Sequence, residues 1–543
     1  MSDRALAIPH AEPLHALLRR HAKVSPDKTA FIWYGATLSY AEIDAASDAF
    51  ALRLLALGVR RGEPVALFMG NCPQYVIAHV GIQKAGAVVC PCGPLNKAHE
   101  LQYQLDDLKA RVIVAAAPLM PVVEQVRMQT ALAHVFVVNY GDLLPASPTL
   151  ALPQELQATR EGQRSIPPGT EDFLAVMRQP SGDISALPVV GLDDLALMTY
   201  TSGTTGLPKG AMLTHDNVLY KTAAAAGCNS LSGDDVMLAI APLYHIAGML
   251  LGLDVTLYSG ATTVLLHRFD PAAAVQAIAH HRVSWWYSIA PMNVACMQVP
   301  GVREMDLSSL RVNPVTSFGI TFTETLARQW REYAPNCESF EAAYGLSETH
   351  TCDTYMPREA IRWGTHGKPV PGTQIRILDA DSGAEMPVGS VGEIVLKSRG
   401  NFRGYWNKPE ATAKTLREGW VHTGDMGKVD ADGYLTFIGR FKEMIKVSGY
   451  SVFPEEVETI LIKHPAVAQA AVIGVADAEK GEVVRAFIVR KPGAEIDEAA
   501  LVAWSRENMA TYKAPKSVRF IDALPATGAG KVLRRLLKDQ DGA

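Results

Sequence analysis

The chain has 543 residues, of which 48% are hydrophobic and 20% are charged, and its formal net charge is -5. At roughly 100–200 residues per domain, this length predicts several structural units. The near balance of acidic and basic residues argues against a dedicated nucleic-acid or polyanion binder, and leaves room for a local basic nucleotide site. Among the seven cysteines, only Cys90 and Cys92 are close in sequence. We therefore expect reduced packing residues in a cytoplasmic compartment, not disulfides or a zinc site.

The first 24 residues carry charges such as Glu12 and Arg19 and contain no apolar core segment, so we expect no signal peptide. Residues 246–266 are apolar, with Asp254 as their only charge. Gly252 and Gly260 interrupt this stretch, and Ser259-Gly260 marks a turn. A buried helix followed by a strand is therefore expected, and not a membrane span.

Short apolar runs alternate with helical stretches through the first half of the chain. Buried strands are predicted at 65–69, 87–91, 111–116 and 134–139, and helices at 40–57 and 74–86. This alternation is typical of an α/β fold with a mostly parallel sheet covered by helices. No fixed-period repeat is present.

The composition and the predicted secondary structure change in the later segments. Residues from about 145 to 190 are rich in Pro, Ser, Gln and Glu, which predicts a long irregular surface connection. Beyond residue 365 short strands and turns follow, such as QIRIL and GEIVLKS. After Arg440 a helix, two strands and a further helix are predicted, which form a small α+β unit. We expect a large N-terminal α/β domain of several subdomains over residues 1–439, and a small α+β domain over 440–543.

The strongest chemical signal is the run TYTSGTTGLPKG at residues 199–210, which follows an apolar strand-like stretch. Its backbone N–H groups and hydroxyls can surround phosphate oxygens, and Lys209 adds a positive charge. The run is not a Walker A loop, because only Leu-Pro separates Gly206 from Lys209 and a glycine follows the lysine. We therefore predict a phosphate-binding loop of another kind.

Five further segments follow this loop in a characteristic order. They are APLYH at 241–245, YGLSET at 344–349, TGD at 423–425, GRFKE at 439–443 and PATGAGK at 525–531. With them the sequence resembles the adenylate-forming superfamily of acyl-CoA synthetases, peptide-synthetase adenylation domains and luciferases, and within it the acyl-CoA synthetase branch. The resemblance extends from about residue 15 to 535. Two more segments, GYW at 404–406 and PEAT at 409–412, match a family stretch with a structural role.

The resemblance implies a set of site residues. Those for ATP are Thr201, Ser202, Gly203, Thr204, Thr205, Gly206, Lys209, Gly319, Ile320, Thr321, Tyr344, Gly345, Thr349, Asp425, Arg440 and Lys531. Those that would be catalytic are Lys531, Glu348, Thr204 and Lys209. Those for the acyl pocket are His245, Trp286, Phe318 and Gly345, and those for coenzyme A are Ser448, Gly449 and Tyr450.

Each role has a physical basis. The Tyr344 ring would stack on adenine, Glu348 would hold Mg²⁺, and Thr349 would donate to the α-phosphate. Asp425 would accept hydrogen bonds from the ribose hydroxyls. Lys531 would offset the repulsion between the substrate carboxylate and the α-phosphate. In the family, the mobile C-terminal domain then swings about a hinge, here Lys442, to admit the thiol.

The implied activity is that of an ATP-dependent carboxylic acid–CoA ligase, which forms an acyl adenylate and releases AMP and pyrophosphate. Its cosubstrates would be ATP, Mg²⁺ and coenzyme A, and a homodimer is a further expectation. One segment departs from the family, since SFGIT at 317–321 replaces the usual S-G-G-A-P. The bulk of Phe318 favours a compact acid, either a short- or medium-chain fatty acid or a single aromatic ring, over a long chain. No charged residue is evident near Phe318 and the aromatic residues at 285–287, so an apolar acid is expected and not a dicarboxylate.

Three alternatives stay open at this point. The first is an acyl-adenylate ligase that loads a separate carrier protein. An amino acid is disfavoured as its substrate, because the apolar run at 246–249 replaces the aspartate of amino-acid-activating relatives. The second is a luciferase-like oxidative enzyme, and the third is a non-catalytic binding module. The presence of Glu348, Asp425, Arg440 and Lys531 argues against the third.

Overall fold

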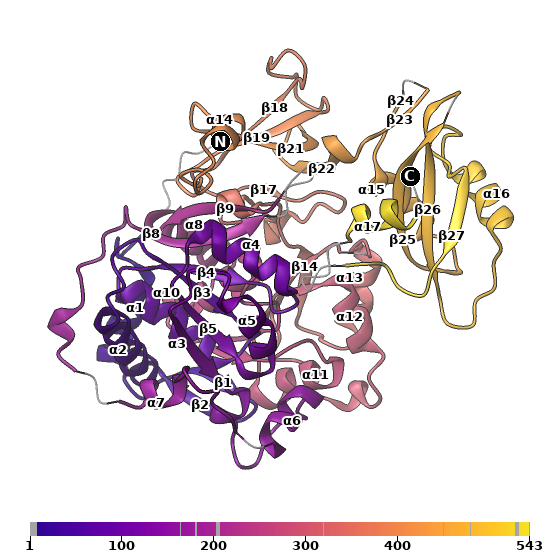
Figure 1. Cartoon of the computed structure of the whole chain (residues 1–543). Coiled ribbons are helices and arrows are strands. Elements are labelled where there is room, and N and C mark those ends of the chain that lie inside the picture. The colour runs from indigo at the N-terminus through magenta and orange to yellow at the C-terminus, as the bar shows by residue number, and fades with distance from the viewer. Residues whose placement is uncertain are drawn as a thin grey trace.

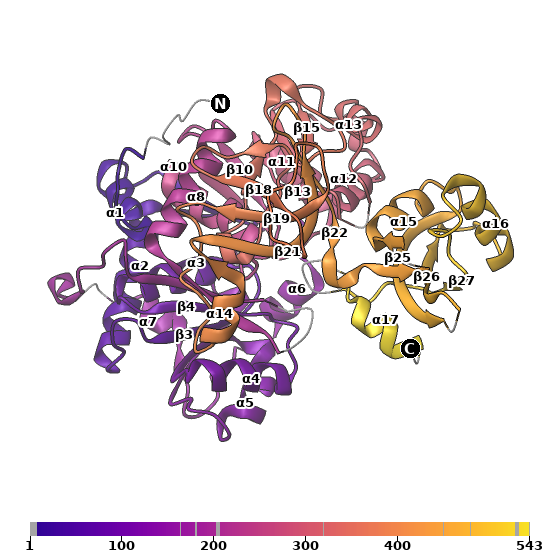
Figure 2. The same ribbon diagram turned by 90° about the horizontal axis from the view of Figure 1, so that it is seen from above.

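A computed structural model gives the conformation of most of the chain. It describes residues 8–162, 164–179, 182–201, 207–318, 320–448, 450–477, 479–526 and 532–541. The fold is mixed α/β, with a large N-terminal domain and a small C-terminal domain, which confirms the predicted fold class. The last elements of the chain lie to one side of the rest (Figures 1 and 2).

The first large sheet has seven strands in the order β7-β6-β5-β3-β4-β8-β9. Its strands are β3 (Pro64–Phe68), β4 (Val88–Cys92), β5 (Val112–Ala116), β6 (His134–Val138), β7 (Glu171–Asp172), β8 (Leu195–Thr201) and β9 (Lys209–Thr214). All pairs are parallel except the β8–β9 hairpin. Every residue of β3, β4 and β5 is buried, as expected of parallel strands covered on both faces, and the four strands predicted in this region are confirmed.

The second large sheet has eight strands in the order β13-β14-β12-β10-β11-β1-β2, with β15 beside β14. Its strands are β1 (Thr29–Trp33), β2 (Ala36–Ser39), β10 (Val236–Ala239), β11 (Thr262–Leu265), β12 (Trp285–Trp286), β13 (Ser288–Ile289), β14 (Val312–Thr316) and β15 (Glu338–Glu341). β14 and β15 run parallel, so the segments at 317–321 and 342–349 leave the sheet at one edge. Polar segments at the carboxyl ends of parallel strands are where α/β proteins place their sites.

Helices cover the two sheets and join them. The helices of this region are α1 (Leu14–Val24), α2 (Tyr40–Ala56), α3 (Pro73–Lys84), α4 (Ala98–Leu108), α5 (Met120–Arg127), α8 (His215–Cys228), α9 (Ile246–Met249), α10 (Val255–Ser259), α11 (Pro271–His281), α12 (Ala290–Met297) and α13 (Glu324–Arg331). One continuous cluster of buried side chains includes Val65 and Leu67 of the first sheet and Leu238 and Val264 of the second. The two sheets therefore share a core.

After the short antiparallel pair of β16 (Thr354–Tyr355) and β17 (Lys368–Pro369), two five-stranded sheets follow. The first contains β18 (Gln374–Leu378), β19 (Gly392–Lys397), β20 (Leu416–Arg417), β21 (Trp420–Val429) and β22 (Leu435–Arg440). The second contains β23 (Ile445–Val447), β24 (Tyr450–Val452), β25 (Val467–Asp477), β26 (Gly481–Arg490) and β27 (Ser517–Phe520), with helices α15 (Pro454–Leu461), α16 (Glu498–Asn508) and α17 (Arg534–Asp541). Buried side chains from residue 445 onward form cores of their own.

The expected irregular connection at 145–190 is wrong in part. It contains the helices α6 (Gln154–Glu161) and α7 (Phe173–Met177), and β7 extends the first sheet by pairing with β6. A few apolar side chains, including Leu156 and Phe173, are fully buried and hold these elements to the domain. Polar composition conceals such short amphipathic helices, since one buried residue per turn suffices.

Residues 246–266 form a buried helical stretch that is followed by β11, as predicted. Between α9 and α10 the helix widens over Leu250–Asp254 into a π-turn. Across the described ranges, no helix is both long and apolar enough to cross a membrane.

Candidate active site

The glycine-rich run joins β8 to β9, and the two ends of this hairpin are held by α4. Thr201 pairs with Lys209 in the antiparallel ladder. The Tyr200 hydroxyl donates to Asp107 at 2.7 Å, and the Tyr103 hydroxyl donates to the Pro208 carbonyl at 2.8 Å. The base of the predicted phosphate loop is therefore fixed on both sides.

Tyr344, which follows β15, is in contact with Asp425 of β21. The Tyr344 hydroxyl donates to Oδ2 of Asp425 at 2.7 Å, and Nε of Arg440 lies 3.3 Å from Oδ1 of the same carboxylate. The Tyr344 ring is buried and stacks on Phe437, with centroids 5.9 Å apart and planes at 27°. Three of the predicted nucleotide residues thus come from distant segments to one place.

Glu348, Lys209 and Tyr405 form a second group. The Tyr405 hydroxyl donates to Oε1 of Glu348 at 2.7 Å, and Nζ of Lys209 lies 4.4 Å from the Tyr405 ring centroid. A single carboxylate suits Mg²⁺, which proteins bind through one or two carboxylates together with substrate phosphates. Tyr405 was assigned only a structural role from its segment, so its contact with Glu348 is a finding that sequence reasoning missed.

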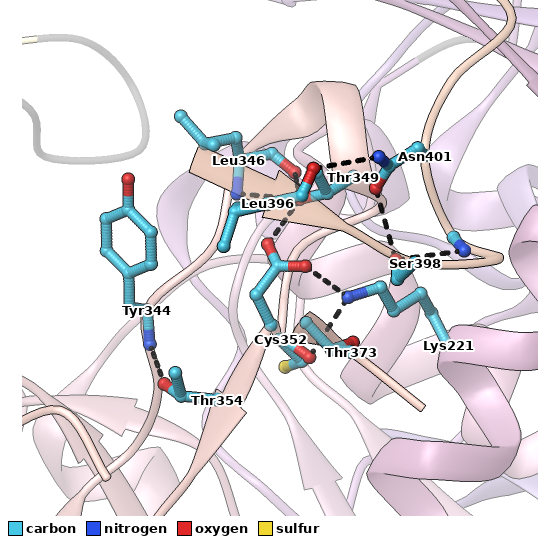
Figure 3. Close-up of polar contacts among 12 residues, drawn as sticks. Lys221, Tyr344, Leu346, Thr349, Cys352, Thr354, Thr373, Leu396, Ser398 and Asn401 are labelled. Carbon is cyan, nitrogen blue, oxygen red and sulfur yellow. Dashed lines mark hydrogen bonds and ion pairs between the residues drawn. The ribbon is translucent and has the colours of Figure 1, made fainter. Parts of the chain in front are cut away.

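Thr349 is fully buried, and its hydroxyl donates to Oδ2 of Asp353. Figure 3 shows Thr349 and Leu346 above the ammonium of Lys221, with the Tyr344 ring to one side. Gly345 is required by close packing, because a Cβ at this position would lie 2.5 Å from the Cys352 backbone nitrogen. The hydroxyl has one hydrogen, so donation to the α-phosphate would replace the bond to Asp353, and that role stays a prediction.

The segment after β14 is tied to Glu341 of β15. The Ser317 N–H donates to Oε1 of Glu341 at 3.0 Å, and the Ser317 hydroxyl donates to Oε2. Phe318 and Ile320 are half-buried and form an antiparallel bridge, and Thr321 is exposed. Sequence reasoning found nothing charged near this segment, and that expectation is wrong, because Glu341 lies directly against it.

The predicted acyl-pocket residues are not all in similar surroundings. His245 is exposed and caps α9, where its Nδ1 accepts from the Ala247 N–H at 3.4 Å. Trp286 is fully buried, and its ring lies 6.0 Å from that of Trp330 in the core. Its neighbour Tyr287 instead donates to or accepts from the Thr316 hydroxyl at 3.1 Å, next to the 317–321 segment. Tyr287 is therefore an aromatic residue that lies beside this segment.

Of the predicted coenzyme A and hinge residues, Ser448, Tyr450 and Lys442 lie at the surface. Ser448 is exposed with φ +50°, and its N–H donates to the Lys480 carbonyl at 2.8 Å. Tyr450 is 58% exposed and stacks on Tyr512 with centroids 4.5 Å apart. Lys442 is exposed within the short helical turn Phe441–Glu443 that follows β22.

Several predicted residues fall outside the described ranges. They are Ser202, Gly203, Thr204, Thr205, Gly206, Gly319, Gly449 and Lys531. Their roles stay predictions.

Three observations agree with the family comparison. They are the order of the sequence segments, the two large sheets that share a core, and the polar groups around Tyr344 and Glu348. Residues 18–406 match the model of the AMP-binding enzyme, and residues 456–531 match that of the AMP-binding enzyme C-terminal domain. This chain belongs to the AMP-binding enzyme family. The predicted resemblance is confirmed.

Similarity to relatives of this AMP-binding enzyme extends along nearly the whole chain. A long-chain-fatty-acid–CoA ligase of Bacillus subtilis (strain 168) is 32% identical over 547 residues, covering 98% of this chain and 96% of the relative. A feruloyl-CoA synthase of Amycolatopsis sp is 36% identical over 519 residues, covering 95% and 96%. A solved anthranilate CoA ligase in complex with anthranoyl-AMP superposes with a TM-score of 0.85 at 28% identity, covering 99% of each chain.

These relatives confirm the predicted reaction class. The AMP-binding enzyme described here is an AMP-forming acyl-CoA synthetase, with ATP, Mg²⁺ and coenzyme A as cosubstrates. The alternative of a ligase that loads a carrier protein is not favoured, since the relatives above are CoA ligases or synthases.

The buried Glu341 makes stability depend on pH. Burial raises the pKa of Glu341 to about 7, while the hydrogen bonds from Ser317 oppose this shift. A folded-state pKa above the unfolded value means that the group's contribution to stability is complete below about pH 4.5 and is lost as the pH rises through 7. We predict that the stability of Glu341→Gln relative to the wild type increases as the pH rises from 5 to 8. The increase is about 3 kcal/mol at most.

Thermal unfolding midpoints at the two pH values test this prediction. Glu338→Gln is the matched control, because Glu338 lies on the same strand but is partly exposed and pairs with Arg358. The control should follow the wild type at both pH values. A Glu341→Gln midpoint that runs parallel to that of the wild type would show that the carboxyl does not titrate in this range.

Proposed function

We propose that this acyl-CoA synthetase adenylates a compact apolar carboxylic acid at the edge where Tyr344, Asp425, Glu348 and Lys209 converge, and then transfers the acyl group to coenzyme A. The observation that supports this placement is the pair of contacts from Tyr344 to Asp425 and from Tyr405 to Glu348. In each contact one partner, Tyr344 or Glu348, belongs to the segment that follows the parallel strand β15. Such a site can hold a nucleoside on one side and its phosphates on the other.

In the first half-reaction, a carboxylate oxygen of the acid attacks the α-phosphorus of ATP, and pyrophosphate leaves. This chemistry depends on positioning and on charge neutralisation. Asp425 would accept from the ribose hydroxyls, while Lys209 and the 202–206 backbone would hold phosphate oxygens. Lys531 would lie between the carboxylate and the α-phosphate. A magnesium ion on Glu348 would supply further charge neutralisation at the phosphates.

In the second half-reaction, the coenzyme A thiolate attacks the acyl carbonyl, and AMP leaves. We propose a domain boundary between residues 439 and 440, with Lys442 as the hinge of a mobile C-terminal domain. The separate cores of the segment after residue 445 support this division. Ser448, Gly449 and Tyr450 would then line the path of the pantetheine arm. The cytoplasmic location and the homodimer stay predictions.

Two variants separate the half-reactions. We expect Lys531→Ala to lower the rate of pyrophosphate release by at least roughly 100-fold. The same variant should spare thioester formation from added acyl-AMP. We expect Lys442→Pro to do the opposite, because proline fixes φ near -65° and locks a hinge that needs two conformations. The assays are pyrophosphate release with acid and ATP, and thioester formation with acyl-AMP and coenzyme A.

The loss of activity of each variant in each of the two assays tests the role proposed for Lys531 and for Lys442. If Lys531→Ala impairs both assays equally, its assignment to the first step is wrong. If Lys442→Pro leaves both assays near the wild-type rates, the hinge lies elsewhere.

The segment after β14 limits the size and charge of the acid that the site can accept. Phe318 is half-buried there, two residues after Thr316, whose hydroxyl lies 3.1 Å from that of Tyr287. Inserting a longer substrate against a packed aromatic wall costs roughly 1–3 kcal/mol. The Glu341 carboxyl behind Ser317 disfavours a second acidic group on the substrate. Among the relatives, the synthase and the anthranilate ligase are named for single-ring acids, whereas the Bacillus enzyme is named for long-chain fatty acids.

We predict that the wild type prefers short or single-ring acids, and that Phe318→Gly shifts this preference toward longer chains by roughly 10-fold or more in relative kcat/KM. A panel of straight-chain and aromatic acids, scored by pyrophosphate release, measures the shift. Phe322→Leu is a control, since Phe322 is buried in a neighbouring core and should change stability without changing the chain-length profile. A wild type most active on sixteen-carbon acids would refute the proposal.

A further inference from the structure

A buried ion pair lies under the segment that carries Tyr344 and Glu348. Lys221 of α8 and Asp353 both have 0% side-chain exposure, and Nζ of Lys221 lies 2.5 Å from Oδ1 of Asp353. Burial raises the pKa of the Asp353 carboxyl, and the Lys221 ammonium opposes this rise. Since desolvating two charges costs several kcal/mol per ion, an apolar pair of similar volume would serve stability as well or better. The charges therefore need an explanation other than stability.

On one side, the pair holds the end of the YGLSET segment. The second carboxylate oxygen of Asp353 accepts from the Thr349 hydroxyl, and the Asp353 N–H donates to the Tyr344 carbonyl at 2.8 Å. Nζ of Lys221 also donates to the Cys352 carbonyl at 3.4 Å. Figure 3 shows the lysine reaching from α8 to these groups.

The backbone at this point is strained. His350, Thr351 and Cys352 have φ values of +56°, +56° and +46°, so three successive non-glycine residues are left-handed. This conformation costs roughly 1–2 kcal/mol per residue and persists only where the surroundings enforce it. The bond from Lys221 to the Cys352 carbonyl and the bonds of Asp353 are among the contacts that enforce it.

On the other side, Lys221 supports the turn that reaches Glu348. A Cβ at Gly400 would lie 2.3 Å from Cε of Lys221, so the Gly400 backbone packs directly on the lysine stem. Two residues later, the Phe402 N–H donates to the Glu348 carbonyl at 2.8 Å. Ser398 and Asn401 of this turn are joined by a hydrogen bond, which Figure 3 shows above the Lys221 side chain. One side chain thus contacts both segments between which Glu348 is held.

We propose that Lys221 and Asp353 are positioning residues for the adenylation step, and that they act by fixing Thr349 and Glu348 against the nucleotide phosphates. The inference rests on the proposed function, which assigns these two residues to ATP. Fixed placement matters because a displacement of about 1 Å in a reacting group costs roughly 100-fold in rate. The second half-reaction needs no attack on the α-phosphorus, so its rate at saturating acyl-AMP should not depend on the pair.

The test is the double variant Lys221→Met/Asp353→Asn, which removes both charges with little change in volume. We expect kcat for pyrophosphate release to fall roughly 10–100-fold, with KM for ATP within about threefold of the wild type and with thioester formation from added acyl-AMP unchanged. The matched control is Lys84→Met/Asp48→Asn, which removes a similarly buried pair with 2% and 6% exposure between α3 and α2. The control should not separate the two half-reactions.

A second variant leaves both charges in place. Gly400→Ala places a methyl group against the lysine stem, and it should give the same selective loss of the first half-reaction. Equal losses in both half-reactions, or the same selectivity in the Lys84 control, would overturn the inference. A wild type that releases no pyrophosphate with any acid would instead overturn the proposed function, so the two failures are distinguishable.

Discussion

Between Tyr344 and Thr354 the chain doubles back, and three hydrogen bonds join the two ends of this return. The Tyr344 carbonyl accepts from the N–H groups of Asp353 and Thr354 at 2.8 and 3.3 Å, and the Tyr344 N–H donates to the Thr354 hydroxyl at 2.8 Å. This closure fixes the direction of the Tyr344 ring and of Glu348 at once. Because both side chains belong to one short strained segment, the nucleoside end and the phosphate end of the site cannot move independently.

The polar groups beneath this segment are buried and paired. Their desolvation costs free energy, but their hydrogen bonds define the orientation of the side chains. Asp353 is enclosed with Lys221, and Glu341 is enclosed with Ser317. A carboxylate in such a place accepts hydrogen bonds from fixed donors, so each rotamer around it is specified. The polar side chains of the site are thus held in fixed positions at the sheet edge, whereas Ser448, Tyr450 and Lys442 lie exposed.

Much of the fold could be predicted from the sequence, because fully buried parallel strands such as β3 and β5 read as continuous apolar runs. The members of the site could be named from the order of motifs, since each motif is local. What could not be predicted is how these residues contact one another. The partner of Glu348 is 57 residues away at Tyr405, and the partner of Lys221 is 132 residues away at Asp353. No local pattern encodes such contacts, and single polar residues within apolar surroundings carry no periodic signal.

The central claim is that the acid is activated as an acyl adenylate at this site. It is tested most directly by isotope transfer from an acid whose carboxylate carries ¹⁸O, in a complete reaction with ATP, Mg²⁺ and coenzyme A. If the carboxylate oxygen attacks the α-phosphorus and AMP then leaves from the acyl carbon, mass spectrometry will find one ¹⁸O atom in AMP and none in pyrophosphate. Unlabelled AMP, or ¹⁸O in pyrophosphate or inorganic phosphate, would contradict the account.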